Sequence, residues 1–172
     1  SLDFLLDSGI IYQTHDNLYF TSPFARFWFA FVSPFFKGIN KGDYSEMQSS
    51  YDKTIDNFIS PIFNQLSMEV LQKYFKKSDY ISKIYPHYDK GIQIDIFAKT
   101  KANKIILGAC KYTNSKMSKK ELTALKDKAN SLNIKADIYV LFSKKGFSNE
   151  LKALKSEDLK LFRANSFVSL LE

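Results

Sequence analysis

Hydrophobic and polar positions alternate most regularly in the middle of the chain, over residues 91–112. Isoleucines at every second position are separated by polar residues, among them Asp95, and this period of two predicts a strand. The polar residues 99–104 predict a turn, and the apolar run from Ile105 predicts a second, buried strand that ends at Lys111. We therefore expect two antiparallel strands, with an acid on the first and a lysine at the end of the second.

Hydrophobic periodicity and turn residues predict helices and strands on both sides of this pair. In chain order we expect a helix over 61–75, a strand over 81–85, the pair itself, a helix from Ser118, a strand over 136–142, a helix over 147–154, a strand over 159–162 and a helical turn over 166–171. Ser60 followed by Pro61 is typical of a helix start, and Ser118 with Glu121 forms a capping-box pattern. A hairpin followed by a helix crossover indicates an α/β (α+β) mixed sheet with helices on both faces.

The N-terminal region has a different pattern. The leucines at 2, 5 and 6 suggest the last turn of a helix, which Gly9 would cap. Residues 10–13 and 18–21 predict a hairpin that turns at His15, Asp16 and Asn17. A helix end followed by a hairpin is how a winged helix finishes, so we expect the chain to begin inside a longer natural protein.

An aromatic helix is expected over residues 24–36, with Pro23 in its first turn. The polar stretch 38–50 that follows is the best candidate for a domain boundary. We therefore expect a wing-like hairpin and an aromatic helix in residues 1–45, and an α/β domain in residues 46–172.

Basic charge is concentrated beside the central strand pair. The chain carries a net charge of +7, and residues 99–128 hold nine lysines and two acids, so this segment alone accounts for +7. The candidate phosphate contacts in it are Lys104, Lys111, Lys116, Lys119 and Lys120. Such a segment favours binding of DNA or RNA through the backbone, and a solvated lysine-rich surface is the alternative.

Two other features concern location. Cys110 is the single cysteine, so no internal disulfide is expected, and a reducing compartment such as the cytoplasm is the simpler expectation. The most apolar run, residues 24–36, is shorter than the ~20 residues that a membrane-spanning helix needs. No membrane association is therefore expected.

Five phrases of the sequence are similar to a known family. They are YFTSPFARFWFAFVSP at 19–34, SPIFNQLSMEVL at 60–71, GIQIDIFA at 91–98, GACKY at 108–112 and LFSKKGFSNEL at 141–151. Their content and order resemble the C-terminal domain of archaeal and bacterial AAA-type ATPases, known as domain of unknown function 234. The resemblance implies a restriction-endonuclease-like core of the PD-(D/E)xK type with the order αβββαβ. It also implies an N-terminal ATPase module in the full-length protein.

The chain departs from this family pattern at three acidic positions. The family has acids where this chain has Asn64, Gln93 and Ala109, so that only Asp95 and Lys111 remain. Mg²⁺-dependent phosphodiester hydrolysis needs several hard oxygen ligands, and Asp95 alone would hold a metal weakly.

One acid nearby is a candidate replacement. Glu121, on the next helix, can stand in for the missing acid, although capping of that helix is the alternative. The candidate catalytic residues are thus Asp95, Lys111 and Glu121, with Asp95 as the metal ligand; a structural salt bridge between Asp95 and Lys111 is the competing interpretation.

Three functional hypotheses remain open. The first is a catalytically degenerate, nuclease-like domain of an AAA-type ATPase that binds nucleic acid and needs no cofactor. The second is an active Mg²⁺-dependent nuclease with rearranged acids. The third is an interaction module, in which Phe27 and Trp28 of the aromatic helix dock on the ATPase module or on a second copy in a homo-oligomer.

Overall fold

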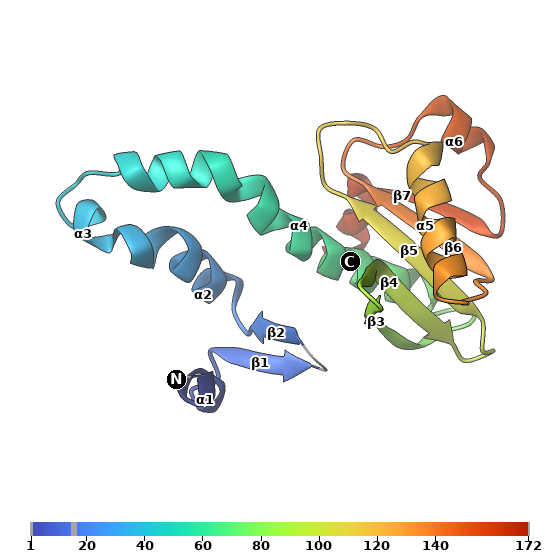
Figure 1. Cartoon of the computed structure of the whole chain (residues 1–172), viewed down its shortest axis with the longest axis horizontal. Helices are drawn as coiled ribbons and strands as arrows, with labels where there is room; N and C mark the ends of the chain where they lie inside the picture. The colour runs from blue at the N-terminus through green and yellow to red at the C-terminus, as the bar shows by residue number, and fades with distance from the viewer. Residues whose placement is uncertain (1, 15–16, 172) are drawn as a thin grey trace. The chain divides into compact units, whose positions relative to one another are not determined.

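The computed structural model describes residues 2–14 and 17–171 of the chain. The chain forms two compact units, Ser1–Ile55 and Asp56–Glu172, and each is described by itself (Figure 1). The division falls within one long helix, α4 (Ser45–Phe75). It lies ten residues (55 minus 45) after the boundary that the sequence predicts between residues 45 and 46.

The first unit contains the predicted hairpin. Its elements are α1 (Leu2–Asp7), β1 (Ile11–Thr14), β2 (Asn17–Phe20), α2 (Pro23–Phe27), η1 (Trp28–Val32), η2 (Ser33–Phe35) and α3 (Phe36–Ile39). β1 and β2 pair antiparallel with Ile11 opposite Phe20, and Gly9 before them has the positive φ of +70° expected of a helix cap. Of the residues expected at the turn, His15 and Asp16 lie outside the described residues, whereas Asn17 is the first residue of β2. The hairpin is confirmed, and the winged-helix assignment stays a prediction.

The aromatic helix is also confirmed, but it is irregular. α2 begins at Pro23, and the Ser22 hydroxyl accepts the Ala25 N–H at 3.5 Å. The chain then continues as a π-helical turn, η1, and a 3-10 turn, η2. Pro34 lies at the start of that 3-10 turn, where its missing N–H is tolerated and where a new helical segment begins.

The start of α4 corrects the sequence analysis. The helix begins at Ser45, whose backbone N–H donates to the Asp43 carboxylate at 3.0 Å, and Pro61 lies in its interior. The prediction that a helix starts at Pro61 with Ser60 as N-cap is therefore wrong. Asp43 supplies a side-chain cap at the earlier start, while Pro61 removes only one backbone hydrogen bond from a helix of 31 residues.

The second unit contains a five-stranded mixed sheet. Its further elements are β3 (Ile81–Asp89), β4 (Ile92–Thr100), β5 (Ile105–Lys111), α5 (Lys119–Ser131), β6 (Ile138–Ser143), α6 (Asn149–Ala153), β7 (Leu159–Arg163) and η3 (Ala164–Leu171). The strands are ordered β3-β4-β5-β6-β7 (Figure 1), and the first three are antiparallel while β5, β6 and β7 are parallel. The α/β class, the mixed sheet and the αβββαβ order are confirmed.

Helices cover both faces of this sheet, as predicted. On one face α4 and η3 pack over the strands, with Phe63, Val70 and Leu71 of α4 in the core. On the other face, α5 packs through Leu122, Leu125 and Ala129, which are the residues that the capping-box helix was expected to bury. No helix of residues 2–14 and 17–171 is long and apolar enough to cross a membrane.

A β-bulge interrupts β4 at the candidate site. Ile94 pairs with His87 and Phe97 pairs with Tyr85. Asp95 and Ile96 of β4 therefore stand opposite Pro86 alone. Pro86 has no N–H for the ladder, which suits such a position. The bulge turns two isoleucines to opposite faces of the sheet, since Ile94 lies in the core under α5 and Ile96 lies in the core under α4. The strict alternation expected from the sequence is therefore broken here.

Candidate functional site

The three candidate catalytic residues line one small cavity. It has a volume of about 210 Å³ and lies between β4, β5 and α5. Asp95 comes from the bulge of β4, Lys111 is the last residue of β5, and Glu121 is in the first turn of α5. Lys128, two turns further along α5, completes the charged part of the lining.

The Asp95 carboxylate acts first as a hydrogen-bond acceptor for the sheet. The backbone pairing of β4 with β5 ends at Ile96 opposite Gly108, and beyond this point the Cys110 N–H donates to Asp95 Oδ2 at 2.8 Å. Burial raises the pKa of Asp95, against a hydrogen bond from Cys110 and the charge of Lys128, which both act to lower it. Asp95 is thus a weaker acid than usual and is committed to the backbone.

Lys111 pairs with Glu121 and not with Asp95. Its ammonium donates to Glu121 Oε1 and lies 3.4 Å from the carbonyl oxygen of Lys116. The other oxygen of Glu121 accepts the backbone N–H and the hydroxyl of Ser118, both at 2.8 Å, which completes the predicted capping box. The competing interpretation, a structural salt bridge between Asp95 and Lys111, is therefore wrong, because Lys111 pairs with Glu121.

These contacts determine the charge of Glu121. Partial burial acts to raise the pKa of Glu121, but the hydrogen bonds from Lys111 and Ser118 together outweigh it and lower the pKa to about 2. Glu121 is therefore ionised at neutral pH, and its charge balances that of Lys111.

The carboxylates of the cavity are already engaged by the protein. Magnesium requires oxygen ligands at near-octahedral geometry, and the cavity offers two carboxylates, Asp95 and Glu121, which already accept hydrogen bonds from the protein. Nowhere in residues 2–14 and 17–171 do three or more histidine, cysteine, aspartate or glutamate side chains come together.

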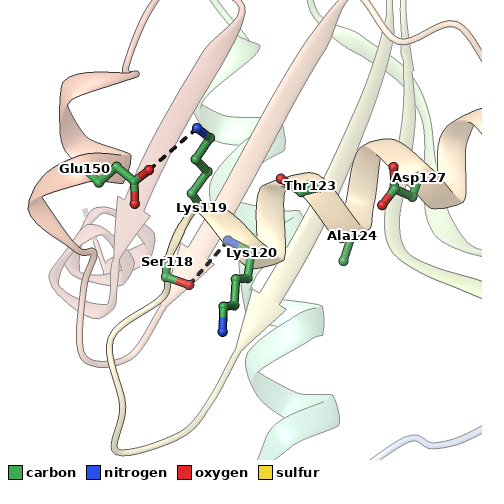
Figure 2. Close-up of a pocket in the computed structure, with 7 residues that line it drawn as sticks. All are labelled: Ser118, Lys119, Lys120, Thr123, Ala124, Asp127 and Glu150. Atoms are coloured by element: carbon green, nitrogen blue, oxygen red, sulfur yellow. Dashed lines mark hydrogen bonds and ion pairs between the residues drawn. The ribbon is translucent and has the colours of Figure 1, made fainter.

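Two of the predicted phosphate contacts stand at the start of α5. Lys119 and Lys120 line a second cavity of about 490 Å³ beside Ser118 (Figure 2). Lys119 reaches Glu150 at 3.6 Å, whereas the side chain of Lys120 points away from that pair (Figure 2). At the helix start, the Ser118 N–H is bonded to the Glu121 carboxylate. Asp127 and Glu150 line the same cavity and Lys119 is paired with Glu150, so Lys120 is the better placed of the two lysines to meet an anion.

Lys104 is not brought to the same place. It precedes β5, and Lys111 ends that strand, so seven residues of extended chain separate them. At about 3.3 Å per residue this is roughly 20 Å. Of the five lysines predicted to contact phosphate, Lys104 lies at the opposite end of the strand from the cavity.

The structure adds basic residues that the sequence analysis did not single out. Met117 and Phe147 form a parallel bridge, which holds the loop after β6 next to the loop after β5. Lys144 and Lys145 in that loop extend the basic edge, and the Lys144 ammonium lies 4.1 Å from the centre of the Tyr112 ring. A Lys-Lys-Gly sequence after a buried strand is a signal for such an edge, but its position depends on a pairing between distant residues.

The fold and the site together define a class. This is a mixed α/β domain with a carboxylate–lysine cavity at the end of its central strand and a basic rim on the neighbouring loops. The family described as "Archaea bacterial proteins of unknown function", domain of unknown function 234, matches residues 28–124. This is more than half of the chain, and the chain belongs to that family.

Among solved structures, the chain is similar to a repair endonuclease from Pyrococcus abyssi. The two are 14% identical, and the match covers 58% of this chain and 45% of that one, with a TM-score of 0.39. A similarity of this size supports no further assignment, so the restriction-endonuclease-like label stays a prediction. Comparison with curated proteins finds no match.

Proposed function

We propose that the second unit binds nucleic acid through its phosphate backbone without cutting it. The observation that carries the proposal is the grouping of lysines at one edge of the sheet, where Lys116, Lys119 and Lys120 are exposed in the loop and first turn after β5. Lys144 and Lys145 stand in the adjoining loop. Cations that follow one edge favour a polyanion and read its backbone more than its bases.

The proposal that the domain does not cut rests on the chemistry of the cavity. Asp95 is bonded to the Cys110 N–H, and Glu121 is bonded to Lys111 and Ser118. The Glu121 carboxylate, which pairs with Lys111 and caps α5, has little charge left to offer a cation, so that Asp95 would be the main protein ligand. Lys111, which would offset charge on a phosphate, is already neutralised by Glu121.

The test is binding of a fluorescent DNA duplex, followed by anisotropy between about 50 and 200 mM salt. We expect binding at low salt that falls steeply as salt rises, and a loss of about tenfold or more in the double variant Lys119→Glu, Lys120→Glu. The matched control is Lys152→Glu with Lys155→Glu, which reverses the same number of exposed charges near the end of α6. If the wild type shows no binding at low salt, or if both double variants weaken binding equally, the proposal is wrong.

A second candidate is a metal-dependent nuclease with rearranged acids. It is favoured by one observation, namely that Asp95, Lys111 and Glu121 line the same cavity. It predicts nicking of plasmid DNA with Mg²⁺ or Mn²⁺ that is lost in Asp95→Ala. A preparation that never cuts, under conditions where the protein binds DNA, would remove this candidate.

We further propose that the chain is the C-terminal part of an AAA-type ATPase, to whose N-terminal module the first unit would attach. In that unit Phe24 and Phe36 are 70% and 51% exposed, while Phe27 and Trp28 are half-buried. Exposed aromatic side chains of this kind mark interaction surfaces, which also keeps a homo-oligomer as a candidate. Light scattering of the wild type and of Trp28→Ala tests the homo-oligomer. If it exists, the wild type has a molar mass above that of the monomer, and the variant does not.

A further inference from the structure

A groove on the other face of the second unit has no role in the function proposed above. Its volume is about 870 Å³, within the range of ligand-binding clefts. One wall is a helical stripe of α4, and the opposite wall comes from β7 and η3. The lining residues are Val70, Lys73, Tyr74, Lys76, Lys77, Leu161, Phe162, Ser166 and Ser169.

An aromatic platform lies in this groove. Phe162 is 8% exposed and forms part of the apolar lining, while Tyr74 is 51% exposed. The Tyr74 ring packs edge-on against Phe162 and Phe75, with distances of 5.2 Å and 5.1 Å between the ring centres. The ring is thus held by two neighbours while half of its surface faces solvent.

The rim of the groove is cationic. Three lysines line it, no acid of residues 2–14 and 17–171 does, and the ammonium of Lys73 donates to the carbonyl oxygen of Ser169. Lys76 and Lys77 form no ion pair with any part of the chain that the structure describes. The field around them is also positive, since residues 56–172 hold 21 basic and 12 acidic side chains, a net charge of +9.

We infer that this groove accommodates an unpaired base of single-stranded nucleic acid, against Tyr74, with Lys76 and Lys77 on the adjacent phosphates. The inference rests on the proposed binding function and names the form of nucleic acid. A duplex keeps its base faces stacked inside the helix, so only an unpaired base can reach an aromatic ring in a groove. A polyanion satisfies the charge of the whole unit, which a short acidic peptide in the groove would leave largely unmatched.

The experiment compares fluorescent oligo-thymidine of about 15 nucleotides with a duplex of the same length, using the full chain. We expect Tyr74→Ala to weaken binding of the single strand about tenfold and to leave duplex binding unchanged. Lys77→Glu should act in the same direction without disturbing the aromatic contacts. Tyr74→Phe, which keeps the ring, should restore most of the single-strand binding that Tyr74→Ala loses. The control Tyr88→Ala, which removes a tyrosine that is 71% exposed on β3, should bind like the wild type.

The outcomes separate the two proposals. If neither probe binds at low salt, the proposed function fails, and this inference with it. If both probes bind but Tyr74→Ala and Lys77→Glu leave the single strand unaffected, the groove inference alone is wrong. A competition experiment gives a further check, with an acidic peptide containing leucine and tryptophan and an unlabelled oligonucleotide of equal charge as the two competitors. If the peptide displaces the labelled single strand as effectively as the oligonucleotide, the groove accepts apolar anions in general, and the groove inference is wrong.

Discussion

Glu121 performs two structural tasks with one carboxylate. One oxygen pairs with Lys111, and the other caps α5 through Ser118. Because these bonds lower its pKa to about 2 from an ordinary value of 4.5, the ionised form is favoured by folding. The stabilisation is fully present above the ordinary pKa and is lost as the pH falls towards the folded pKa.

The first prediction concerns Glu121→Gln. Glutamine still suits a capping box, but it leaves Lys111 without its counter-charge. We expect the free energy of unfolding at neutral pH to fall by about 1 kcal/mol, and the difference from the wild type to shrink between about pH 4.5 and 2. Urea unfolding at several pH values measures this. The control is Glu150→Gln, because Glu150 and Lys119 form a more exposed ion pair at 3.6 Å, and we expect it to change stability little. If Glu121→Gln lowered stability by the same amount at all pH values, the role assigned to the Glu121 charge would be wrong.

Gly108, in the phrase GACKY, is required for packing. A Cβ added there would lie 2.7 Å from Val140 Cγ2 and 2.9 Å from the Cβ of Ile96, both buried in the sheet. The second prediction is that Gly108→Ala lowers the free energy of unfolding by about 2 kcal/mol, since overpacking forces the strands apart. The double variant with Val140→Ala should be less destabilised than the sum of the single changes, as urea unfolding will show. Additive effects would mean that the two side chains do not meet.

Much of the candidate site was predictable residue by residue, and the limits of this have physical reasons. Asp95 and Lys111 come together because adjacent strands of a short hairpin must pair, and Glu121 follows from a local capping pattern. The partner of Lys111 was not predictable, because it depends on where α5 begins relative to the end of β5. Lys128 enters the cavity only through the packing of α5 on the sheet.

At the scale of helices and strands, local sequence signals predicted an element correctly where the signal had a single interpretation. Ser118 and Glu121 fix the start of α5, and the apolar runs fix β5 and β6. Ser60 followed by Pro61 had two interpretations, a helix start or a break within a longer helix, and the local sequence favoured the first. The helix continues because Asp43 caps it much earlier and because the cost of an interior proline is offset along its length.

The third prediction tests that interior proline. Pro61 is exposed within α4, so an alanine there restores a backbone donor and a better helix former without filling any buried space. We expect Pro61→Ala to increase the helical circular-dichroism signal and to raise the free energy of unfolding by about 1 to 3 kcal/mol. Thermal and urea unfolding provide the measurement. A decrease in stability would mean that the bend which proline imposes is needed for the packing of α4.

At the scale of the whole molecule, the two units differ in how much core they hold. The second unit has two clusters of buried side chains, one on each face of its sheet. In the described part of the first unit, the buried hydrophobic residues are Ile11 and Phe31. A chain segment of that size with so little buried surface is at the lower limit of independent stability, and this difference was not visible from composition, because the first unit is rich in aromatic residues.

The last prediction follows from this difference. A fragment of residues 43–172 keeps the Asp43 cap, the whole of α4 and both buried clusters. We expect it to fold cooperatively and to retain the affinity of the full chain for nucleic acid, because the basic edge and the groove both lie within it. A fragment of residues 1–42 should show few dispersed amide signals in NMR spectra when alone. Circular dichroism, urea unfolding and the anisotropy assay described above test the larger fragment. A cooperative fold for residues 1–42, or loss of binding by a folded 43–172 fragment, would show that the aromatic unit contributes more than its buried residues indicate.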